Sequence, residues 1–155
     1  MINNKKILVI SGCTAKKLLY AAPAKNLYQG VLFKKIKKLV AYNQLDFMIL
    51  SAKYGLIHGN DIIKPYDKTL KNKNDILKLR KRVIPKLKVI ELNYDLIIII
   101  MGKKYRDVLS PLFNDNKYKM IYDERGIGGL TSKINEYLKC TLNKIIFDLK
   151  SCEIC

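Results

Sequence analysis

Acidic residues, histidine and arginine are all scarce in this sequence of 155 residues. Thirteen Asp and Glu stand against thirty Lys and Arg, so the formal net charge is +17. An excess of this size attracts polyanions and speeds their encounter, which makes RNA, DNA or a phosphorylated small molecule the candidate partners. A lysine-rich surface is also typical of compositional drift in an AT-rich genome, so both interpretations stay open. Arginine is the better residue for bidentate phosphate or base recognition, and the only arginines are Arg80, Arg82, Arg106 and Arg125.

Long apolar segments are absent as well. No stretch approaches the roughly 20 apolar residues of a membrane span, and the longest run, Leu96 to Met101, has the length of a buried strand. The first apolar run ends at Ser11-Gly12, which is too early for the h-region of a secretory signal peptide. These absences predict a cytoplasmic protein with no membrane partner.

Cysteine and histidine are too few to indicate a metal site. The four cysteines are expected to be reduced in the cytosol. Cys152 and Cys155 form a lone CxxC pair, whereas a zinc site needs a second pair or histidines. Cys140 would be a third ligand, and His58 is the only histidine. We therefore predict no metal and no other cofactor, and a C-terminal tail at residues 151–155.

Short apolar runs alternate along the chain with amphipathic segments. The runs predict four strands: Lys6–Ser11, Asp46–Ser51, Asp95–Met101 and Tyr118–Tyr122. Apolar residues at helical spacing predict four helices, which are Pro23–Asn43, Asn72–Leu92 with a break or kink at Pro85, Lys103–Phe113 and Thr131–Leu149. Three of the strands are continuously apolar, which is typical of a parallel sheet covered by helices on both faces. We predict a single α/β domain at residues 1–150, with three α/β/α layers and a mostly parallel four-stranded sheet.

Polar residues follow three of the predicted strands directly, at Ser11–Lys17, Ser51–Gly55 and Gly102–Tyr105. In an open parallel sheet, ligands bind beyond the carboxyl ends of the strands, where the strand order reverses. If the sheet is parallel, the three loops meet at one edge, and each brings a lysine together with serine or tyrosine. The sequence therefore predicts one polar site at that edge.

Three residues are candidates for the reacting groups: Cys13, Lys53 and Asp67. Cys13 follows a strand and lies near lysines that would activate its thiol, although a small half-buried residue is the alternative. Lys53 follows a buried strand and would bind phosphate or act as base or nucleophile, unless it is simply solvated. Asp67 would act as a general base or pair with a lysine, or else form a turn or cap the next segment.

Other residues are candidates for substrate contacts. Serine hydroxyls would bind a ligand or merely favour turns, and glycine amides ahead of a helix would bind an anion or form a tight turn. Tyrosines would stack on a base. Histidine titrates near neutrality, so His58 is either a site residue or an ordinary surface histidine. The predicted substrate-binding residues are Ser11, Gly12, Lys16, Tyr28, Ser51, Tyr54, Tyr66, Gly102, Tyr105, Gly126 and Gly128.

Four motifs occur in an order that resembles a known family. They are Ser11-Gly-Cys13-x-x-Lys16, Ala22-Pro-Ala-Lys-Asn-Leu-Tyr28 with Phe33, Leu50-Ser-Ala-Lys-Tyr-Gly-Leu56, and Ile63-Lys-Pro-Tyr66-Asp67-x-Thr69-Leu70. With Gly102-x-x-Tyr105 and Gly126-Ile-Gly128 they extend over most of the chain. The chain resembles a family of small, largely uncharacterised bacterial, archaeal and phage proteins that carry a Ser-Ala-Lys-Tyr-Gly-Leu signature.

The first motif also resembles the Pro-Cys-Ser-x-x-Lys-Pro-Tyr segment of archaeosine synthase, the archaeal enzyme that modifies a deazaguanine base in transfer RNA. Gly12 stands where that segment has proline, and the Pro-Tyr that ends the segment is absent here. The related module is similar in fold to uracil-DNA glycosylases, so this resemblance implies a three-layer α/β domain of that kind.

These observations predict an enzyme that acts on a nucleobase, nucleoside or nucleotide, either free or within RNA or DNA. Glycosidic-bond cleavage, base exchange and base modification such as tRNA deazaguanine chemistry are the candidate reactions. Lysines would neutralise phosphate, tyrosines would stack on the base, and Asp67 would handle the proton. Two alternatives stay open, namely a non-catalytic, basic nucleic-acid-binding accessory protein and a sensor of a free nucleotide.

Overall fold

The computed structural model describes residues 5–151, and these residues fold around a five-stranded sheet. The strand order is β4-β3-β1-β6-β7; β3, β1, β6 and β7 are parallel, and β4 runs antiparallel to β3 at one edge. The continuously apolar β1 and β6 lie in the middle, because their side chains are buried on both faces. The strands of this sheet are β1 (Ile7–Gly12), β3 (Asp46–Ser51), β4 (Gly55–His58), β6 (Leu96–Ile100) and β7 (Tyr118–Ile121).

The predicted α/β class is confirmed, but the predicted number of four strands is wrong. The fifth strand is β4, a segment that the sequence predicts as loop. It turns back along β3 after a short connection, and Gly55 takes a φ of +75° there, a conformation that glycine adopts at little cost. A strand of four residues that begins with glycine and ends with histidine has too little periodicity to be recognised.

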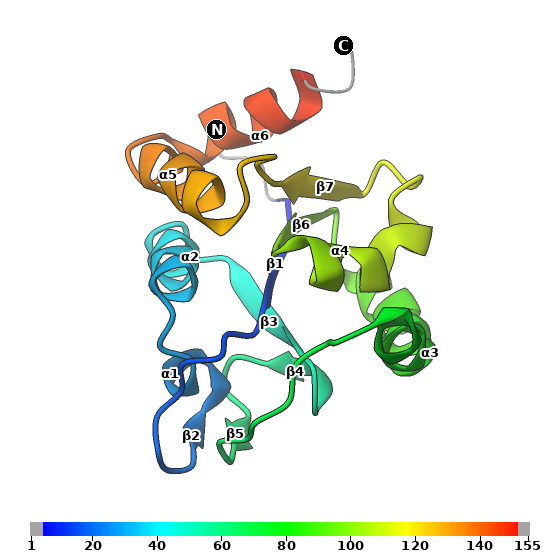
Figure 1. Ribbon diagram of the computed structural model, residues 1–155. Helices are drawn as coiled ribbons and strands as arrows, with labels where there is room; N and C mark the ends of the chain where they lie inside the picture. The colour runs from blue at the N-terminus through cyan, green and yellow to red at the C-terminus, as the bar shows by residue number, and fades with distance from the viewer. Residues whose placement is uncertain (1–4, 152–155) are drawn as a thin grey trace.

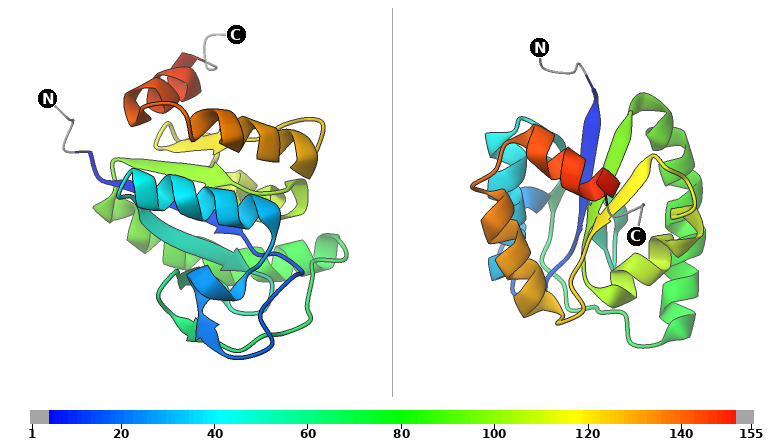
Figure 2. Two further views of the ribbon diagram at one scale, coloured as in Figure 1. Left: turned by 90° about the vertical axis from the view of Figure 1, so that its left-hand side faces the viewer. Right: turned by 90° about the horizontal axis from the view of Figure 1, so that it is seen from above.

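Helices cover both faces of the sheet, so the domain has three layers (Figure 1). Helices α2, α5 and α6 cover one face and α3 and α4 the other, each over its own apolar core. Figure 2 shows the same layers from the side and from above. None of the helices in residues 5–151 is both long and apolar enough to cross a membrane. The helices are α2 (Val31–Tyr42), α3 (Lys73–Ile90), α4 (Lys103–Leu109), α5 (Ile127–Tyr137) and α6 (Leu142–Ser151), with the short 3-10 helices η1 (Glu91–Asn93) and η2 (Ser110–Leu112).

A small subdomain lies beneath the main layers in Figure 1. It consists of β2 (Ala22–Pro23), α1 (Ala24–Leu27) and β5 (Ile62–Ile63), and β2 pairs with β5 in antiparallel fashion. Its own apolar core is formed largely by residues of the second and fourth sequence motifs, among them Tyr28 and Ile63.

The predicted helix Pro23–Asn43 is two helices, α1 and α2, separated by residues 28–30. The chain leaves the helical path at Tyr28, which bridges to Lys17 of the loop after β1, and α2 starts only at Val31. Position 30 leaves no room for a side chain, because a Cβ there would lie 2.7 Å from Thr14 Cγ2 of the same loop after β1. The interruption of the helix therefore depends on contacts with the loop after β1, which the periodicity of apolar residues along the chain cannot reveal.

Of the break or kink predicted at Pro85, the break is wrong, since α3 continues through this residue. Proline removes the N–H that would bond to the carbonyl four residues earlier, at Lys81. Both residues lie on the exposed side of α3, so water can satisfy that carbonyl. Conversely, the predicted single helix Thr131–Leu149 is two helices, because the chain turns between α5 and α6 at residues 138–141.

The strand order reverses at the centre of the sheet. The chain passes from β1 to β3 on one side and then returns to β6 on the other side of β1. The loop after β1 leads to α2 on one face, whereas the loop after β6 leads to α4 on the opposite face. Two neighbouring strands whose loops diverge in this way leave a crevice beyond their carboxyl ends.

Candidate ligand-binding site at the carboxyl edge of the sheet

A cavity of about 530 Å³ opens where β1 and β6 diverge. Its walls come from the loop after β1, the start of α2, the end of β6 and the start of α4, with Ile127 and Thr131 of α5 closing one side. This volume is within the range of about 300–1,000 Å³ that is typical of small-molecule sites. The structure thus brings the loops after the first and third predicted strands to one place.

Cys13 and Tyr105 meet in this cavity wall. The Cys13 thiol donates a hydrogen bond to the Tyr105 hydroxyl at 3.1 Å, and the backbone N–H of Cys13 is anchored on the Leu50 carbonyl. Gly12 allows this approach, because a Cβ at Gly12 would lie 3.2 Å from Met101 Cβ and 3.5 Å from Tyr105 Cγ. Burial, and then the proximity of Cys13, raises the pKa of Tyr105 far above its usual range. The phenol therefore stays protonated at neutral pH and is available as a hydrogen-bond donor.

A hydrogen-bonded network of tyrosines and serine lies beside the cavity. The Tyr66 hydroxyl is 2.7 Å from the Tyr28 hydroxyl and 2.7 Å from Ser51 Oγ, and Ser51 is fully buried. Burial raises the pKa of Tyr28 to about 12, and burial followed by the proximity of Cys13 raises the pKa of Tyr66 still further. Cys13 packs against this cluster as well as against the core below α3 and α4. Cys13 therefore links the cavity to the tyrosine network, as does Phe33, whose ring lies 5.3 Å from that of Tyr28.

The Ser51-Ala-Lys-Tyr-Gly55 segment is the tight turn between β3 and β4. Ser51 Oγ accepts hydrogen bonds from the N–H groups of Lys53 and Tyr54, and Arg82 donates to the Lys53 carbonyl at 3.1 Å. The Lys53 side chain is exposed, with Nζ 5.2 Å from the centre of the Tyr54 ring and 6.0 Å from that of Tyr66. Lys53 thus lies at the same edge as Cys13, against the tyrosine network, but it does not line the cavity.

The other predicted site residues fall into three groups. Lys16 and Gly102 line the cavity with Gly12, Cys13 and Tyr105. Ser11 is buried and donates to the Gly12 carbonyl, so its hydroxyl faces the protein rather than the cavity. Asp67 is exposed, and no hydrogen bond or ion pair of its side chain is found within residues 5–151.

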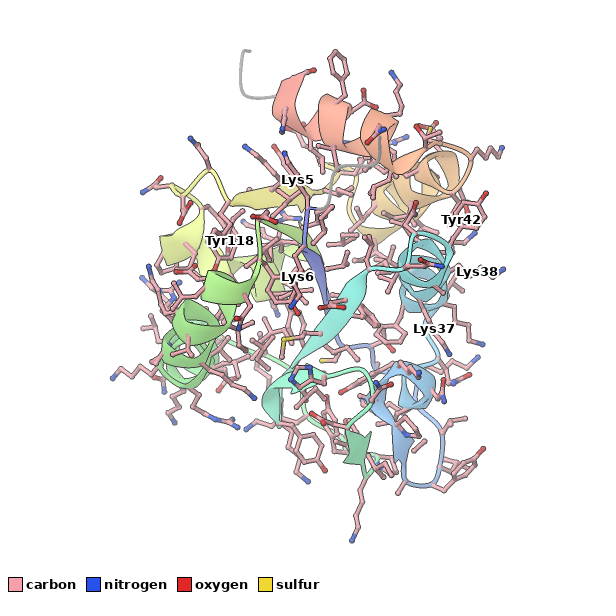
Figure 3. The ribbon with its side chains drawn as sticks, turned by 180° about the vertical axis from the view of Figure 1, so that it is seen from behind. Lys5, Lys6, Lys37, Lys38, Tyr42 and Tyr118 are labelled. Carbon is pink, nitrogen blue, oxygen red and sulfur yellow. The ribbon has the colours of Figure 1, made fainter. Side chains whose placement is uncertain are left out.

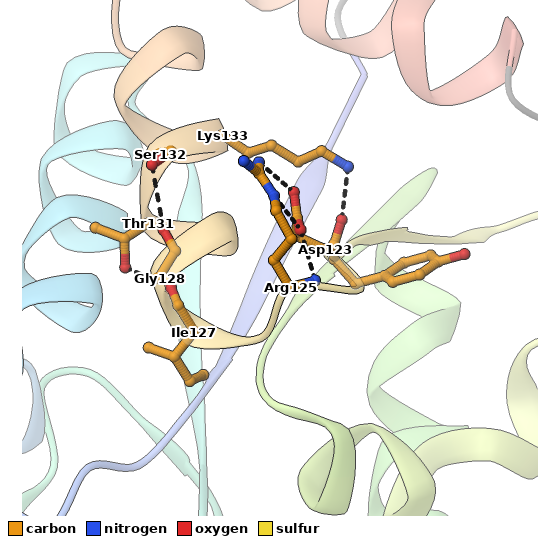
Figure 4. Close-up of polar contacts among 8 residues, drawn as sticks. Asp123, Arg125, Ile127, Gly128, Thr131, Ser132 and Lys133 are labelled. Carbon is orange, nitrogen blue, oxygen red and sulfur yellow. Dashed lines mark hydrogen bonds and ion pairs between the residues drawn. The ribbon is translucent and has the colours of Figure 1, made fainter.

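The glycines near the end of the chain belong to the start of α5. Gly126 is the N-cap, with a φ of +87°, and borders a second hollow of about 440 Å³ next to the cavity. Gly128 lies inside the first turn, where its carbonyl accepts from Ser132, and it lines neither hollow (Figure 4). Arg125 holds Asp123 in a two-point ion pair beside them, and this pairing keeps the pKa of that carboxyl well below its usual range.

His58 lies away from the cavity. It is exposed at the end of β4, where its backbone N–H is bonded to Asp61, and it borders a hollow near the amino end of the parallel strands together with Asp46 and Tyr94. Within residues 5–151, no group of three or more His, Cys, Asp and Glu side chains is arranged to hold a metal ion. Cys152 and Cys155 lie outside the described residues, as does the predicted tail apart from Ser151, which ends α6.

Several cavity residues are not among the predicted site residues: Thr14, Gly30, Val31, Phe33, Ile36, Lys103, Lys104, Ile127 and Thr131. Thr14, Lys103 and Lys104 lie within the polar loops that the sequence places at the site, and Gly30 has a signal of its own, because a glycine interrupts the apolar periodicity before α2. Its N–H is bonded to Thr14 Oγ1, and no side chain caps α2. The exposed Lys16, Lys103 and Lys104 add positive charge at the same mouth. An anionic group would be favoured here by the lysines and by the amino end of α2 together.

The fold places these residues in a three-layer α/β protein that has a cavity at a reversal of strand order. A family model described as a family of unknown function, DUF6884, matches residues 7–136, so the chain belongs to that family. The matched range runs from the start of β1 into α5 and includes every cavity residue. Comparison with curated proteins and with solved structures finds no match.

Proposed function

We propose that the chain is an enzyme that acts on a nucleobase, nucleoside or nucleotide, free or within RNA or DNA. The observation that carries the proposal is the contact between the Cys13 thiol and the Tyr105 phenol in the wall of a nucleoside-sized cavity. The exposed side chains of Val31 and Ile127 and the half-buried Tyr105 ring offer apolar surface to a flat base, and the lysines at the mouth offer charge to a phosphate.

Cys13 is the reacting group in this proposal, and Tyr105 is the proton or hydrogen-bond donor. In glycosidic-bond cleavage or base exchange, the departing base gains negative charge, which a protonated phenol beside it would stabilise. Lys53 and Asp67 lie outside the cavity, so we assign Lys53 to a phosphate contact at the rim and no longer place Asp67 at the reacting atoms. Base modification of the deazaguanine kind would use the same thiol.

The sequence resemblances support this class of reaction. The Ser11-Gly-Cys13-x-x-Lys16 motif, which resembles a segment of archaeosine synthase, contributes Gly12, Cys13 and Lys16 to the cavity wall. The three-layer architecture is also compatible with a uracil-DNA-glycosylase-like fold, which we retain as part of the proposal.

A non-catalytic protein that binds nucleic acid through its charge is the second candidate. The observation that favours it is the net charge of +17 together with lysines that are not confined to the carboxyl edge. Seen from behind in Figure 3, Lys5 and Lys6 lie at the start of β1, and Lys37 and Lys38 lie on α2. Such a protein would lose affinity steeply with salt and would show no dependence on Cys13. A nucleotide sensor would use the cavity without turnover.

The proposal can be tested by measuring whether the protein binds and turns over a defined panel of compounds. The panel contains free bases including a deazaguanine, the ribonucleosides and their monophosphates, with thermal shift for binding and chromatography for released or altered base. We expect at least one class to bind, and Cys13→Ser to abolish turnover while Cys140→Ser, the other half-buried cysteine among residues 5–151, leaves it unchanged. Lys53→Ala should weaken phosphorylated ligands only. Binding that is lost with salt and unaffected by any of these variants would favour the second candidate.

A further inference from the structure

A basic groove between α3 and α4 adjoins the cavity. It encloses about 570 Å³ and shares Lys103 and Lys104 with the cavity wall. Lys71, Asn72 and Lys73, where α3 begins, also line it, and Lys104 donates to the neighbouring Leu70 carbonyl at 3.2 Å. Because the two hollows share a wall, an extended ligand could occupy both at once.

Positive charges predominate in the groove. Lys71, Lys73 and Lys103 are exposed, Lys104 is exposed but its ammonium donates to the Leu70 carbonyl, and Asp107 is the single carboxylate among the residues that line the groove. Arg80 is engaged inside the protein, where its guanidinium donates to the carbonyls of Asp107 and Val108. The groove therefore offers lysine ammonium groups, which contact phosphates as point charges, rather than a free arginine fork that reads a base or carboxylate edge.

Apolar side chains line the same groove. Ile76 is half-buried on α3, and Leu77 is 38% exposed beside it. A groove that offers both lysines and apolar surface suits a single strand, whose phosphates need charge and whose bases or sugars need apolar contact. A duplex would keep its bases stacked inside, so a base could reach the cavity only from a single strand or by flipping out.

We propose that this groove holds the sugar–phosphate backbone of a single-stranded nucleic acid from which one base enters the cavity. The inference rests on the proposed function and narrows it, because the substrate is then a polynucleotide rather than a free nucleotide. Sequence preference comes from the base in the cavity, and the groove supplies affinity that does not depend on sequence.

Charge-neutralising pairs on α3 test this assignment. Lys71→Gln with Lys73→Gln removes groove lysines that do not line the cavity, and Lys78→Gln with Lys81→Gln removes exposed lysines of the same helix outside the groove. Binding is measured by fluorescence anisotropy with a labelled 10-nucleotide single-stranded RNA and its DNA equivalent across a salt series. Mononucleotide binding and alkylation of Cys13 are followed in parallel.

The double variant Lys71→Gln/Lys73→Gln should bind the oligonucleotides about tenfold more weakly than the wild type. The slope of log affinity against log salt should be smaller by about 1.4, for two lost phosphate contacts. The same double variant should keep wild-type mononucleotide affinity and lose the protection of Cys13 by the oligonucleotide. The control pair should stay within about twofold. The proposed role of the groove would be overturned if both double variants lost the same amount of oligonucleotide affinity, or if a ten-residue polyglutamate competed with the labelled oligonucleotide as well as the unlabelled oligonucleotide does. Intact oligonucleotide binding without any mononucleotide binding or Cys13 protection would instead overturn the proposed function of the cavity.

Discussion

The Cys13 thiol lies 3.1 Å from the Tyr105 hydroxyl, although the two residues are 92 positions apart in the chain. The contact exists because β1 and β6 are neighbours in the sheet, and the residues that follow them are packed together where their loops separate. It gives the cavity a nucleophilic atom beside a phenol that burial keeps protonated.

Removal of the Tyr105 hydroxyl should slow the chemistry of Cys13. A protonated phenol can donate to the thiolate, and a hydrogen bond to a charged group is worth about 1.5–3 kcal/mol. We expect Tyr105→Phe to reduce the rate of Cys13 alkylation at pH 7.5 by about tenfold, as measured by peptide mass spectrometry. Cys140, which lies in the turn after α5 and whose thiol donates to the Glu136 carbonyl, serves as the internal control. An unchanged rate at Cys13 would show that the phenol does not act on the thiol.

The turn that carries Lys53 should depend on Gly55. Its φ of +75° strains any side chain, so Gly55→Ala should lower the free energy of unfolding by about 1 kcal/mol or more. Gly128 is the matched control, because it is helical and a Cβ there meets nothing within 4 Å. Gly128→Ala should be neutral or stabilising by up to about 1 kcal/mol. Urea unfolding of both variants measures the difference, and a Gly55→Ala variant as stable as Gly128→Ala would contradict the geometry of this turn.

Ser51 should contribute more to the free energy of unfolding than an exposed serine does. Its buried oxygen accepts from two backbone N–H groups and bonds to Tyr66, all of which Ser51→Ala leaves without that partner. We expect a loss of about 1–3 kcal/mol in unfolding free energy. Ser132→Ala, on the exposed side of α5, should change it by less than about 0.5 kcal/mol. A double-mutant cycle with Tyr66→Phe should show coupling between Ser51 and Tyr66, and strict additivity of the two losses would mean that the network does not act as a unit.

Alkaline pH should destabilise the protein through its buried tyrosines. Tyrosine ordinarily titrates at about pH 10, and burial raises the pKa of Tyr28 to about 12 in the folded state. Below pH 10 both states hold the proton and Tyr28 contributes no pH dependence. Between pH 10 and 12 only the unfolded state releases it, so the unfolding free energy falls by about 1.4 kcal/mol per pH unit for this residue. From pH 10 to 11 the unfolded tyrosine goes from half to nearly fully deprotonated, so Tyr28→Phe should make the decline over this interval smaller by about 1 kcal/mol in urea titrations; identical declines would count against the burial of this hydroxyl.

The central strands could be predicted because each is encoded by a short run of consecutive apolar residues. The runs at Leu8, Met48 and Ile98 are apolar on successive residues, which only a doubly covered strand accommodates. Since parallel strands share one carboxyl edge, the site containing Cys13 and Tyr105 follows from the strand directions alone. The features that escaped prediction depend on distant contacts or single backbone angles.

Gly30 and Gly55 illustrate the difference. Gly30 ends a helical pattern because Thr14, sixteen residues earlier, occupies the space of its side chain. Gly55 starts a strand because its positive φ turns the chain back. Likewise, the sequence brings Lys53 and Asp67 to the correct edge, but whether a side chain faces a cavity or solvent depends on packing, and here both face solvent.

A crystal structure with the tightest-binding nucleotide of the panel tests the central claim most directly. The account predicts density for the base against Cys13 and Tyr105, with any phosphate directed toward Lys16 or Lys103 at the cavity mouth. A nucleotide ordered on the lysines at the other end of the sheet, with the space between β1 and β6 left to solvent, would contradict it.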